Sequence, residues 1–220
     1  MDGRTSSSLV PKLSLYPRIS NDSWNPTLID IEFGLAEALG SNTMRVFLHD
    51  LAYEVDKVGF MSRVNTLLDL AEKHGLKLLL VIFDSCFGTY YRVPVIGQQV
   101  QPVPGVMMSQ WVQSPGDEAM NDPSQQPRLE AYVKDLISTF ANDTRVLGWD
   151  VFNEPPCNGH ESQGLFDLLT NVFAWCRSVD PIQPCTSPLF SVDVDTGDLS
   201  KYRTHSLIQL NNSDVITFHE

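Results

Sequence analysis

The stretch that decides the fold is LGWDVFNEPP, residues 147–156. It begins as an apolar run typical of a buried strand and ends abruptly in Asn153, Glu154 and two prolines, which interrupt regular structure. A polar turn after a strand would be ordinary by itself. A glutamate at the end of a buried strand is also a candidate for acid–base chemistry, so the surrounding sequence must decide between the two interpretations.

The flanking sequence alternates predicted strands with predicted helices. Apolar residues at helical spacing predict helices at 26–39, 58–74, 127–141 and 164–178, with Asn25 as an N-cap. Short apolar runs predict strands at 43–48, 77–84, 146–152 and 214–219, and a short one near 185–188. Residues 87–127 show no clean period and form a predicted long loop. Repeated strand–helix units indicate a parallel sheet, either doubly wound or a (β/α)8 barrel.

Two observations favour the barrel over the doubly wound sheet. The sequence lacks the G-x-G-x-x-G and G-x-x-x-x-G-K-[ST] patterns of nucleotide-binding folds. Polar residues end or follow several strands, among them His49, Asp84, Glu154 and His219, and this placement is typical of barrels. We therefore predict an incomplete (β/α)8 barrel of about five or six of the eight βα units over residues 21–220, after an irregular segment at 1–20.

The charge of the chain limits its partners. The formal net charge of -12 argues against nucleic acid and anionic membranes, which both require basic patches. No apolar run approaches the ~20 residues of a membrane span. Residues 1–20 carry no secretory signal pattern, so the sequence leaves the localisation open.

The cysteines and possible glycan acceptors are less informative. Four cysteines show no metal-ligand spacing, and structural thiols are the default prediction. Spacing does not decide whether Cys157 or Cys176 pairs with Cys185. Asn-x-Ser/Thr triplets begin at Asn21, Asn142 and Asn211.

Several segments, taken in order, resemble glycoside hydrolase family 5, a cellulase-like family of retaining (β/α)8 glycosidases. They are NTMRVFLHD (42–50), FDSC (83–86), PGVMMSQWVQSPG (104–116), LGWDVFNEP (147–155) and SDVITFH (213–219). The likeness covers about residues 26–219. It implies hydrolysis of O-glycosidic bonds in an oligo- or polysaccharide by a monomer, without cofactor or metal.

The resemblance also implies roles for individual residues. Glu154 matches the general acid/base at the end of the fourth strand, and Asn153 matches the amide that binds the sugar 2-hydroxyl. Arg45 matches the arginine that supports the carboxylate pair. The remaining predicted substrate contacts are His49, Asp84, Trp111 and His219. Retaining hydrolysis needs two carboxyl groups about 5–5.5 Å apart, and the pKa of the acid must be raised by burial or by a neighbouring negative charge.

The sequence departs from the family at its end. The family's nucleophile is a glutamate that ends the seventh strand, whereas the sequence stops at Glu220, after the predicted sixth strand. We therefore expect a truncated product or partial gene model whose 220 residues alone are inactive, with Glu220, Asp84 and Asp50 as weaker substitutes for the nucleophile. The alternative is a non-catalytic, carbohydrate-binding remnant or a partial gene product without independent activity.

Overall fold

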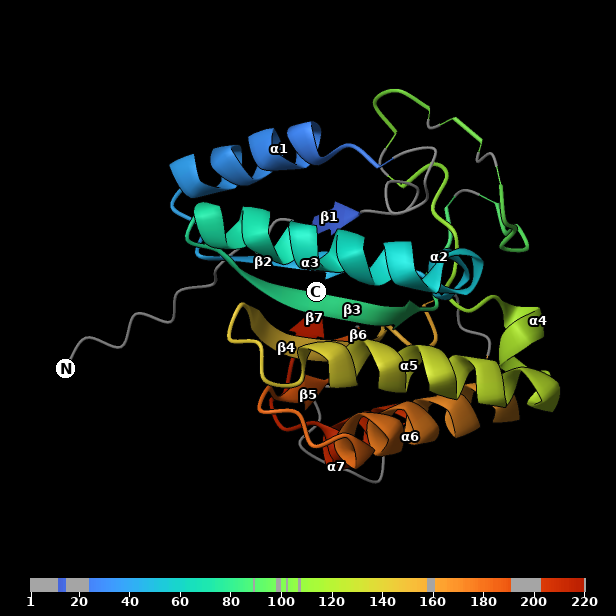
Figure 1. Ribbon diagram of the computed structural model, residues 1–220. Helices are drawn as coiled ribbons and strands as arrows, with labels where there is room; N and C mark the ends of the chain where they lie inside the picture. The colour runs from blue at the N-terminus through green and yellow to red at the C-terminus, as the bar shows by residue number, and fades with distance from the viewer. Residues whose placement is uncertain are drawn as a thin grey trace.

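The computed structural model describes residues 12–14, 24–88, 90–97, 100–101, 103–106, 108–157, 161–190 and 203–219. Its main sheet contains five strands that are all parallel and follow one another in chain order (Figure 1). They are β1 (Lys12–Ser14), β2 (Thr43–Phe47), β3 (Lys77–Asp84), β4 (Val146–Asn153) and β5 (Cys185–Thr186). The predicted parallel pairing of the strands at 77–84 and 146–152 is confirmed.

A sixth strand position follows β5. Strand β6 (Leu189–Phe190) continues the path of β5 and pairs in parallel with β7 (Phe218–His219). The backbone amide of Asp214 also donates to the carbonyl of Cys185 over 2.8 Å. The segments 185–190 and 214–219 therefore lie side by side over a longer stretch than β6 and β7 alone. Strand order in one direction, without reversal, is the arrangement of a barrel and not of a doubly wound sheet.

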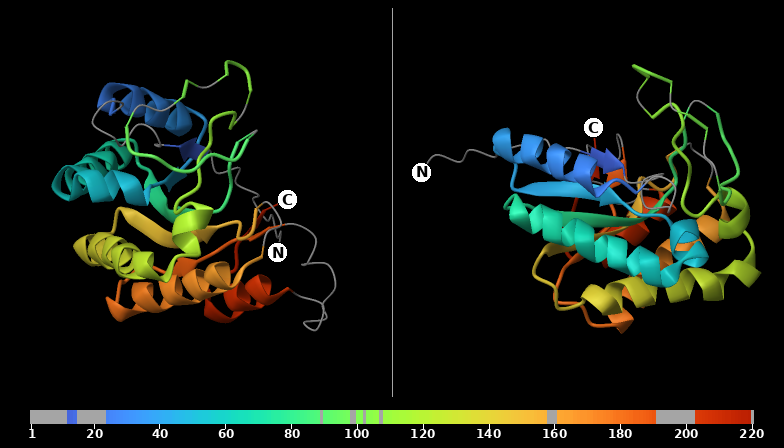
Figure 2. Two further views of the ribbon diagram at one scale, coloured as in Figure 1. Left: turned by 90° about the vertical axis from the view of Figure 1, so that its right-hand side faces the viewer. Right: turned by 45° about the horizontal axis from the view of Figure 1, so that its top comes forward.

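The longer helices lie along the outer face of the curved sheet, in chain order, whereas two short helices of six and four residues lie by the carboxyl ends of the strands (Figures 1 and 2). The helices are α1 (Pro26–Ala38), α2 (Asp50–Val55), α3 (Lys57–Lys73), α4 (Asp117–Met120), α5 (Gln126–Phe140), α6 (Gln163–Ser178) and α7 (Thr204–Asn212), with a 3-10 turn at Pro123–Gln125. Asn25 caps α1 as predicted, since its side chain accepts a hydrogen bond from the Leu28 amide. Among the described residues, no helix is long and apolar enough to cross a bilayer.

The core lies between the sheet and the helices, and its side chains determine what faces the barrel interior. Met44 and Val46 of β2 pack into the core on the helix side. Successive strand residues point to opposite faces, so Arg45 and Phe47 face inward. Asp150 of β4 likewise lies between the core residues Trp149 and Val151. Polar groups therefore enter the interior from two strands.

The structure corrects several predictions from the sequence. Strand β1 lies within the segment expected to be irregular, and for Lys12–Ser14 that expectation is wrong. Helices α2, α4 and α7 were not predicted, because they are short or carry no strong apolar period. The last predicted strand, 214–219, is a regular strand only at Phe218–His219. The remaining part of the irregular segment, and Glu220, lie outside the described residues.

Candidate active site

Glu154 follows β4 directly and has a special backbone conformation. Its φ of 44° lies in the left-handed region, which is unfavourable for a residue with a side chain. Residues held in such conformations cluster at functional sites, because the surrounding structure must enforce them. The side chain is only 9% exposed. Glu154 is therefore a buried carboxyl on a backbone that its neighbours must hold in place.

Two connections hold this backbone to the segment after β3. The hydroxyl of Ser85 donates to the carbonyl of Glu154 over 2.6 Å and accepts from the amide of Cys157 over 2.8 Å. A disulfide joins Cys86 to Cys157 and links the same two segments covalently. The segments that follow β3 and β4 are thus fixed to each other at the Glu154 carbonyl and at Cys157.

The carboxyl group of Glu154 faces a histidine and the disulfide. Nδ1 of His219 contacts Oε1 within hydrogen-bonding distance. Oε2 lies 2.9 Å from Sγ of Cys86 and 3.6 Å from Sγ of Cys157. Both sulfurs belong to the disulfide and carry no proton, so they donate no hydrogen bond to this oxygen.

These three residues are also a cluster of potential metal ligands. Within the described ranges, Cys86, Glu154 and Cys157 form the one group of three such residues whose ligand atoms lie within 4.8 Å of one another. A thiol must be deprotonated and unpaired to bind a metal. The disulfide removes both sulfurs from that role, so the arrangement does not fit a metal centre.

A buried polar network supports the next residue, Asn153. Its Oδ1 accepts from Nη2 of Arg45 over 2.7 Å, and its Nδ2 donates to Oδ1 of Asp84 over 2.7 Å. Arg45 also donates through Nε to Asp150 over 2.9 Å. On the other side, the indole of Trp111 donates to Oδ2 of Asp84. The amide group of Asn153 is therefore fixed at both of its polar atoms.

Burial shifts the two acids of this network toward their protonated forms. It raises the pKa of Asp84 from its ordinary value to about 6, although the hydrogen bonds from Asn153, Cys86 and Trp111 act in the opposite direction. Burial also raises the pKa of Asp150, against the attraction of the neighbouring Arg45 guanidinium. Burying either carboxyl group in its charged form thus costs free energy, and the hydrogen bonds and the ion pair within the network offset part of that cost.

The structure brings most of the predicted site residues together. Glu154 and His219 are in direct contact, and Arg45, Asn153, Asp84 and Trp111 form one continuous network beside them. Trp111 keeps part of its surface accessible and packs edge-on against Phe47, with ring centroids 4.8 Å apart.

Two residues that were predicted to contact the substrate instead use their polar atoms to bond other groups of the protein. His49 is 2% exposed; its Nδ1 accepts from the Leu51 amide at the start of α2, and its Nε2 bonds to the carbonyl of Gln113 over 2.9 Å. Asp84 is 3% exposed and accepts three hydrogen bonds. We therefore assign His49 to helix capping and Asp84 to the support of Asn153 and Trp111.

Three features of the site were not found from the sequence. Asp150 had a usable signal, because a lone acid within an otherwise apolar strand needs a buried partner. Ser85 had no signal, since its hydroxyl bridges residues far away in the chain. The sequence predicts structural thiols by default and leaves open a bridge from Cys185 to Cys157 or to Cys176. The structure pairs Cys185 with Cys176, and it pairs Cys157 with Cys86, a bridge that the sequence did not suggest.

Comparisons with known proteins bear on the family and the fold. No protein-family model matches the chain. Over 149 residues the chain is 22% identical to mannan endo-1,4-beta-mannosidase F of Aspergillus clavatus, a match that covers 64% of this chain and 30% of that protein. The chain thus spans about 30% of the length of this curated relative.

Solved structures share the fold at low sequence identity. The beta-mannanase of the blue mussel Mytilus edulis superimposes with a TM-score of 0.66 at 13% identity, covering 94% of this chain and 67% of that one. GH5_18 from Streptomyces cattleya superimposes with a TM-score of 0.52 at 16% identity, covering 76% of this chain and 40% of that one. The comparisons confirm both expectations: this chain resembles glycoside hydrolase family 5, and its fold is an incomplete (β/α)8 barrel.

Proposed function

We propose that this chain provides the acid/base side of the active site of a retaining β-glycan hydrolase, and that the glycan is a β-1,4-linked mannan. The observation that carries the proposal is the Glu154 carboxyl, buried at the end of β4, with one oxygen held by His219 and the fixed amide of Asn153 next to it in the chain. In this role Glu154 protonates the leaving oxygen and later accepts a proton from water.

The polar network around Asn153 presents two groups that a sugar could contact, the amide of Asn153 and the ring of Trp111. The amide nitrogen of Asn153 carries two protons, gives one to Asp84 over 2.7 Å and lies 3.6 Å from the Cys86 sulfur. A disulfide sulfur is a weak acceptor, so a sugar hydroxyl that reaches this buried nitrogen would replace the sulfur as the partner of the second proton. The partly accessible ring of Trp111, whose nitrogen is tied to Asp84, offers an apolar face to a sugar ring. Asn153 would orient the sugar, and Trp111 would provide apolar contact area.

Arg45 has a donor that suits the second carboxylate of the mechanism. Its Nη1 is buried and has no hydrogen-bond partner among the described residues. A carboxylate next to a guanidinium is kept ionised, as a nucleophile must be. This supports the role that the family resemblance gives to Arg45.

The substrate is proposed from the relatives. The fungal relative is named for endo-1,4-beta-mannosidase action on mannan, and the mussel structure is titled a beta-mannanase. The first experiment is therefore calorimetric titration of the 220-residue chain with manno-, cello- and xylo-oligosaccharides. We expect binding of the manno-oligosaccharides that is weakened in Trp111→Ala. Equal binding of all three glycans would reject the choice of mannan.

The catalytic role of Glu154 requires a separate measurement. Hydrolysis of two aryl β-mannosides is compared in the wild type and in Glu154→Gln, first in this chain and then in a chain extended by two further βα units. An acidic phenol departs without protonation, whereas a poor leaving group needs the acid. The substitution should slow cleavage of the poor leaving group by about 10²–10⁴-fold, and formation of the glycosyl-enzyme from the good one far less.

The outcomes separate the proposal from its alternative. Equal losses on both substrates would indicate that Glu154 is structural. Mannan binding without hydrolysis in either chain would favour a non-catalytic carbohydrate-binding protein.

A further inference from the structure

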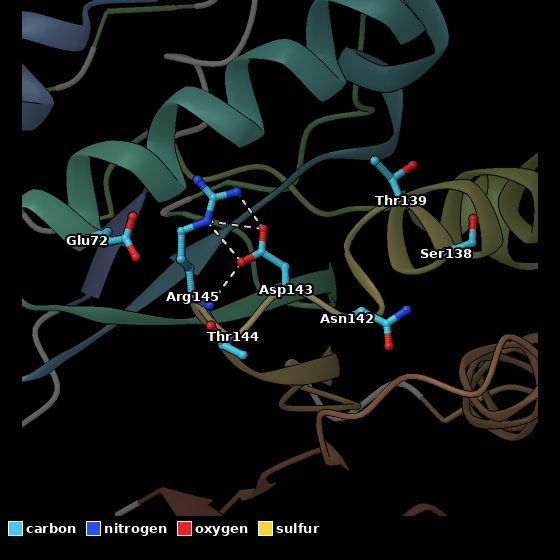
Figure 3. Close-up of a pocket in the computed structure, with 7 residues that line it drawn as sticks. All are labelled: Glu72, Ser138, Thr139, Asn142, Asp143, Thr144 and Arg145. Atoms are coloured by element: carbon cyan, nitrogen blue, oxygen red, sulfur yellow. Dashed lines mark hydrogen bonds and ion pairs between the residues drawn. The ribbon is translucent and has the colours of Figure 1, made fainter.

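The turn between α5 and β4 carries one of the Asn-x-Ser/Thr triplets of the sequence, Asn142-Asp143-Thr144. Asn142 and Thr144 are both exposed. Within the described part of the chain, the side-chain amide of Asn142 makes no hydrogen bond. Figure 3 shows this amide pointing away from the ion pair between Asp143 and Arg145. The acceptor nitrogen and the hydroxyl two residues later are therefore both accessible.

The backbone of this turn is well fixed although its side chains are exposed. The amide of Asp143 donates to the carbonyl of Phe140 over 3.0 Å, and the carbonyl of Asp143 accepts from the side chain of Gln183 over 2.7 Å. Arg145 closes the turn through its ion pair with Asp143. A bulky group on Asn142 would therefore project into solvent without breaking any contact that holds the turn.

The surface next to Asn142 has room for a sugar. An open hollow of about 480 Å³ lies beside it, and its lining is polar: Glu72, Ser138, Thr139, Asn142, Asp143, Thr144 and Arg145 (Figure 3). The hydroxyls of Ser138 and Thr139 donate to the carbonyl of Asp135 within their own helix. Their oxygens can still accept hydrogen bonds from a sugar.

The cysteines indicate the compartment in which such a modification occurs. All four cysteines are paired in disulfides. Disulfides persist in oxidising compartments such as the endoplasmic reticulum lumen, where asparagine-linked glycans are also attached. This observation is independent of the triplet and of the turn.

We propose that Asn142 is an N-glycosylation site. The reaction joins the side-chain nitrogen of Asn142 to the anomeric carbon of N-acetylglucosamine, supplied by a lipid-pyrophosphate-linked oligosaccharide. The bond from that carbon to the phosphate oxygen breaks, the lipid pyrophosphate departs with its electron pair, and the nitrogen loses one proton. The modification requires no property of the proposed glycosidase site.

The position of Asn142 separates its glycan from Glu154. The turn precedes the first residue of β4, whereas Glu154 follows the last. Eight strand residues at about 3.3 Å each place the two ends roughly 26 Å apart. The glycan is therefore expected to leave oligosaccharide binding at the site unchanged.

The second triplet with described residues, Asn211-Asn212-Ser213, is a weaker candidate. Asn211 lies in the last turn of α7, and the Ser213 hydroxyl already accepts from the Ser187 amide over 3.3 Å. The triplet at Asn21 lies outside the described residues. Asn211 therefore serves as the internal comparison.

The test expresses the full 220-residue chain behind a cleaved secretion signal in a eukaryotic host. The secreted protein is treated with peptide N-glycosidase in heavy-oxygen water, which labels each formerly glycosylated asparagine, and the peptides are read by mass spectrometry. We expect the label at Asn142, its loss in Thr144→Ala, and its retention in Thr144→Ser and in Asn211→Gln.

Two results would overturn the proposal. One is an unlabelled Asn142 in secreted wild-type protein whose four cysteines are oxidised, and the other is a label at Asn142 that persists in Thr144→Ala. Occupancy is measured on the wild type, so a variant that fails to be secreted does not block the conclusion.

Discussion

Replacing Asp150 with asparagine should destabilise the protein by breaking a buried ion pair. Asp150 is 1% exposed and Arg45 is 4% exposed, and one oxygen of Asp150 accepts both Nε and Nη2 of the guanidinium. The asparagine oxygen can take the place of that oxygen, so the change removes the charge but keeps the shape. The Arg45 charge is then buried without a counter-charge, and we expect a loss of about 3 kcal/mol in the free energy of unfolding, at the lower end of the range for broken buried pairs.

The assay is urea unfolding followed by circular dichroism and tryptophan fluorescence at neutral pH, with the slope against denaturant checked for constancy. The matched control is Glu130→Gln, because Glu130 forms an exposed ion pair with Lys134 one helical turn away. Breaking that pair should change the unfolding free energy by no more than about 0.5 kcal/mol.

Equal, small losses in the two variants would refute the reasoning. They would mean that the folded protein keeps Asp150 protonated, or that Arg45 finds another partner when Asp150 is neutral. Either outcome would remove the ion pair from the physical account of how Asn153 is held.

Three further predictions concern the groups around Glu154. Asp84 has a folded-state pKa of about 6, above its ordinary value of 3.8, so the folded state retains a proton that the unfolded chain has lost. Its contribution to the free energy of unfolding is therefore present below pH 3.8 and is lost as the pH rises through about 6, a fall of roughly 3 kcal/mol. Urea unfolding at several pH values should show this fall in the wild type and not in Asp84→Asn. Ser85→Ala removes the hydroxyl that bridges the Glu154 carbonyl and the Cys157 amide, so it should lower the stability by about 1–3 kcal/mol in thermal unfolding and weaken oligosaccharide binding. Unchanged binding would show that Ser85 does not position Glu154 for the substrate. Replacing Cys86 and Cys157 together with serine opens a loop of sequence separation 71 and should cost about 4 kcal/mol by urea unfolding, whereas a loss below about 1 kcal/mol would show that the bridge constrains little.

The local features of the sequence determined the framework of this protein. The helices at α1, α3, α5 and α6 and the strands β2, β3 and β4 follow from apolar periodicity, which records the side that each element buries. The placement of polar residues at strand ends predicted which of them converge, because parallel strands bring their carboxyl ends to one edge. Glu154, Asn153 and Arg45 were identified on that basis together with the family resemblance.

Only the tertiary structure decided how these residues are held. The partner of Arg45 is 105 positions away in Asp150, and the bridge through Ser85 spans 69 positions to Glu154. The pairing of Cys86 with Cys157 and the capping role of His49 likewise depend on distances between separate segments. Periodicity records the burial of each residue relative to its neighbours in the chain, whereas hydrogen bonds and disulfides depend on where distant segments meet. That information exists only after the strands have packed side by side.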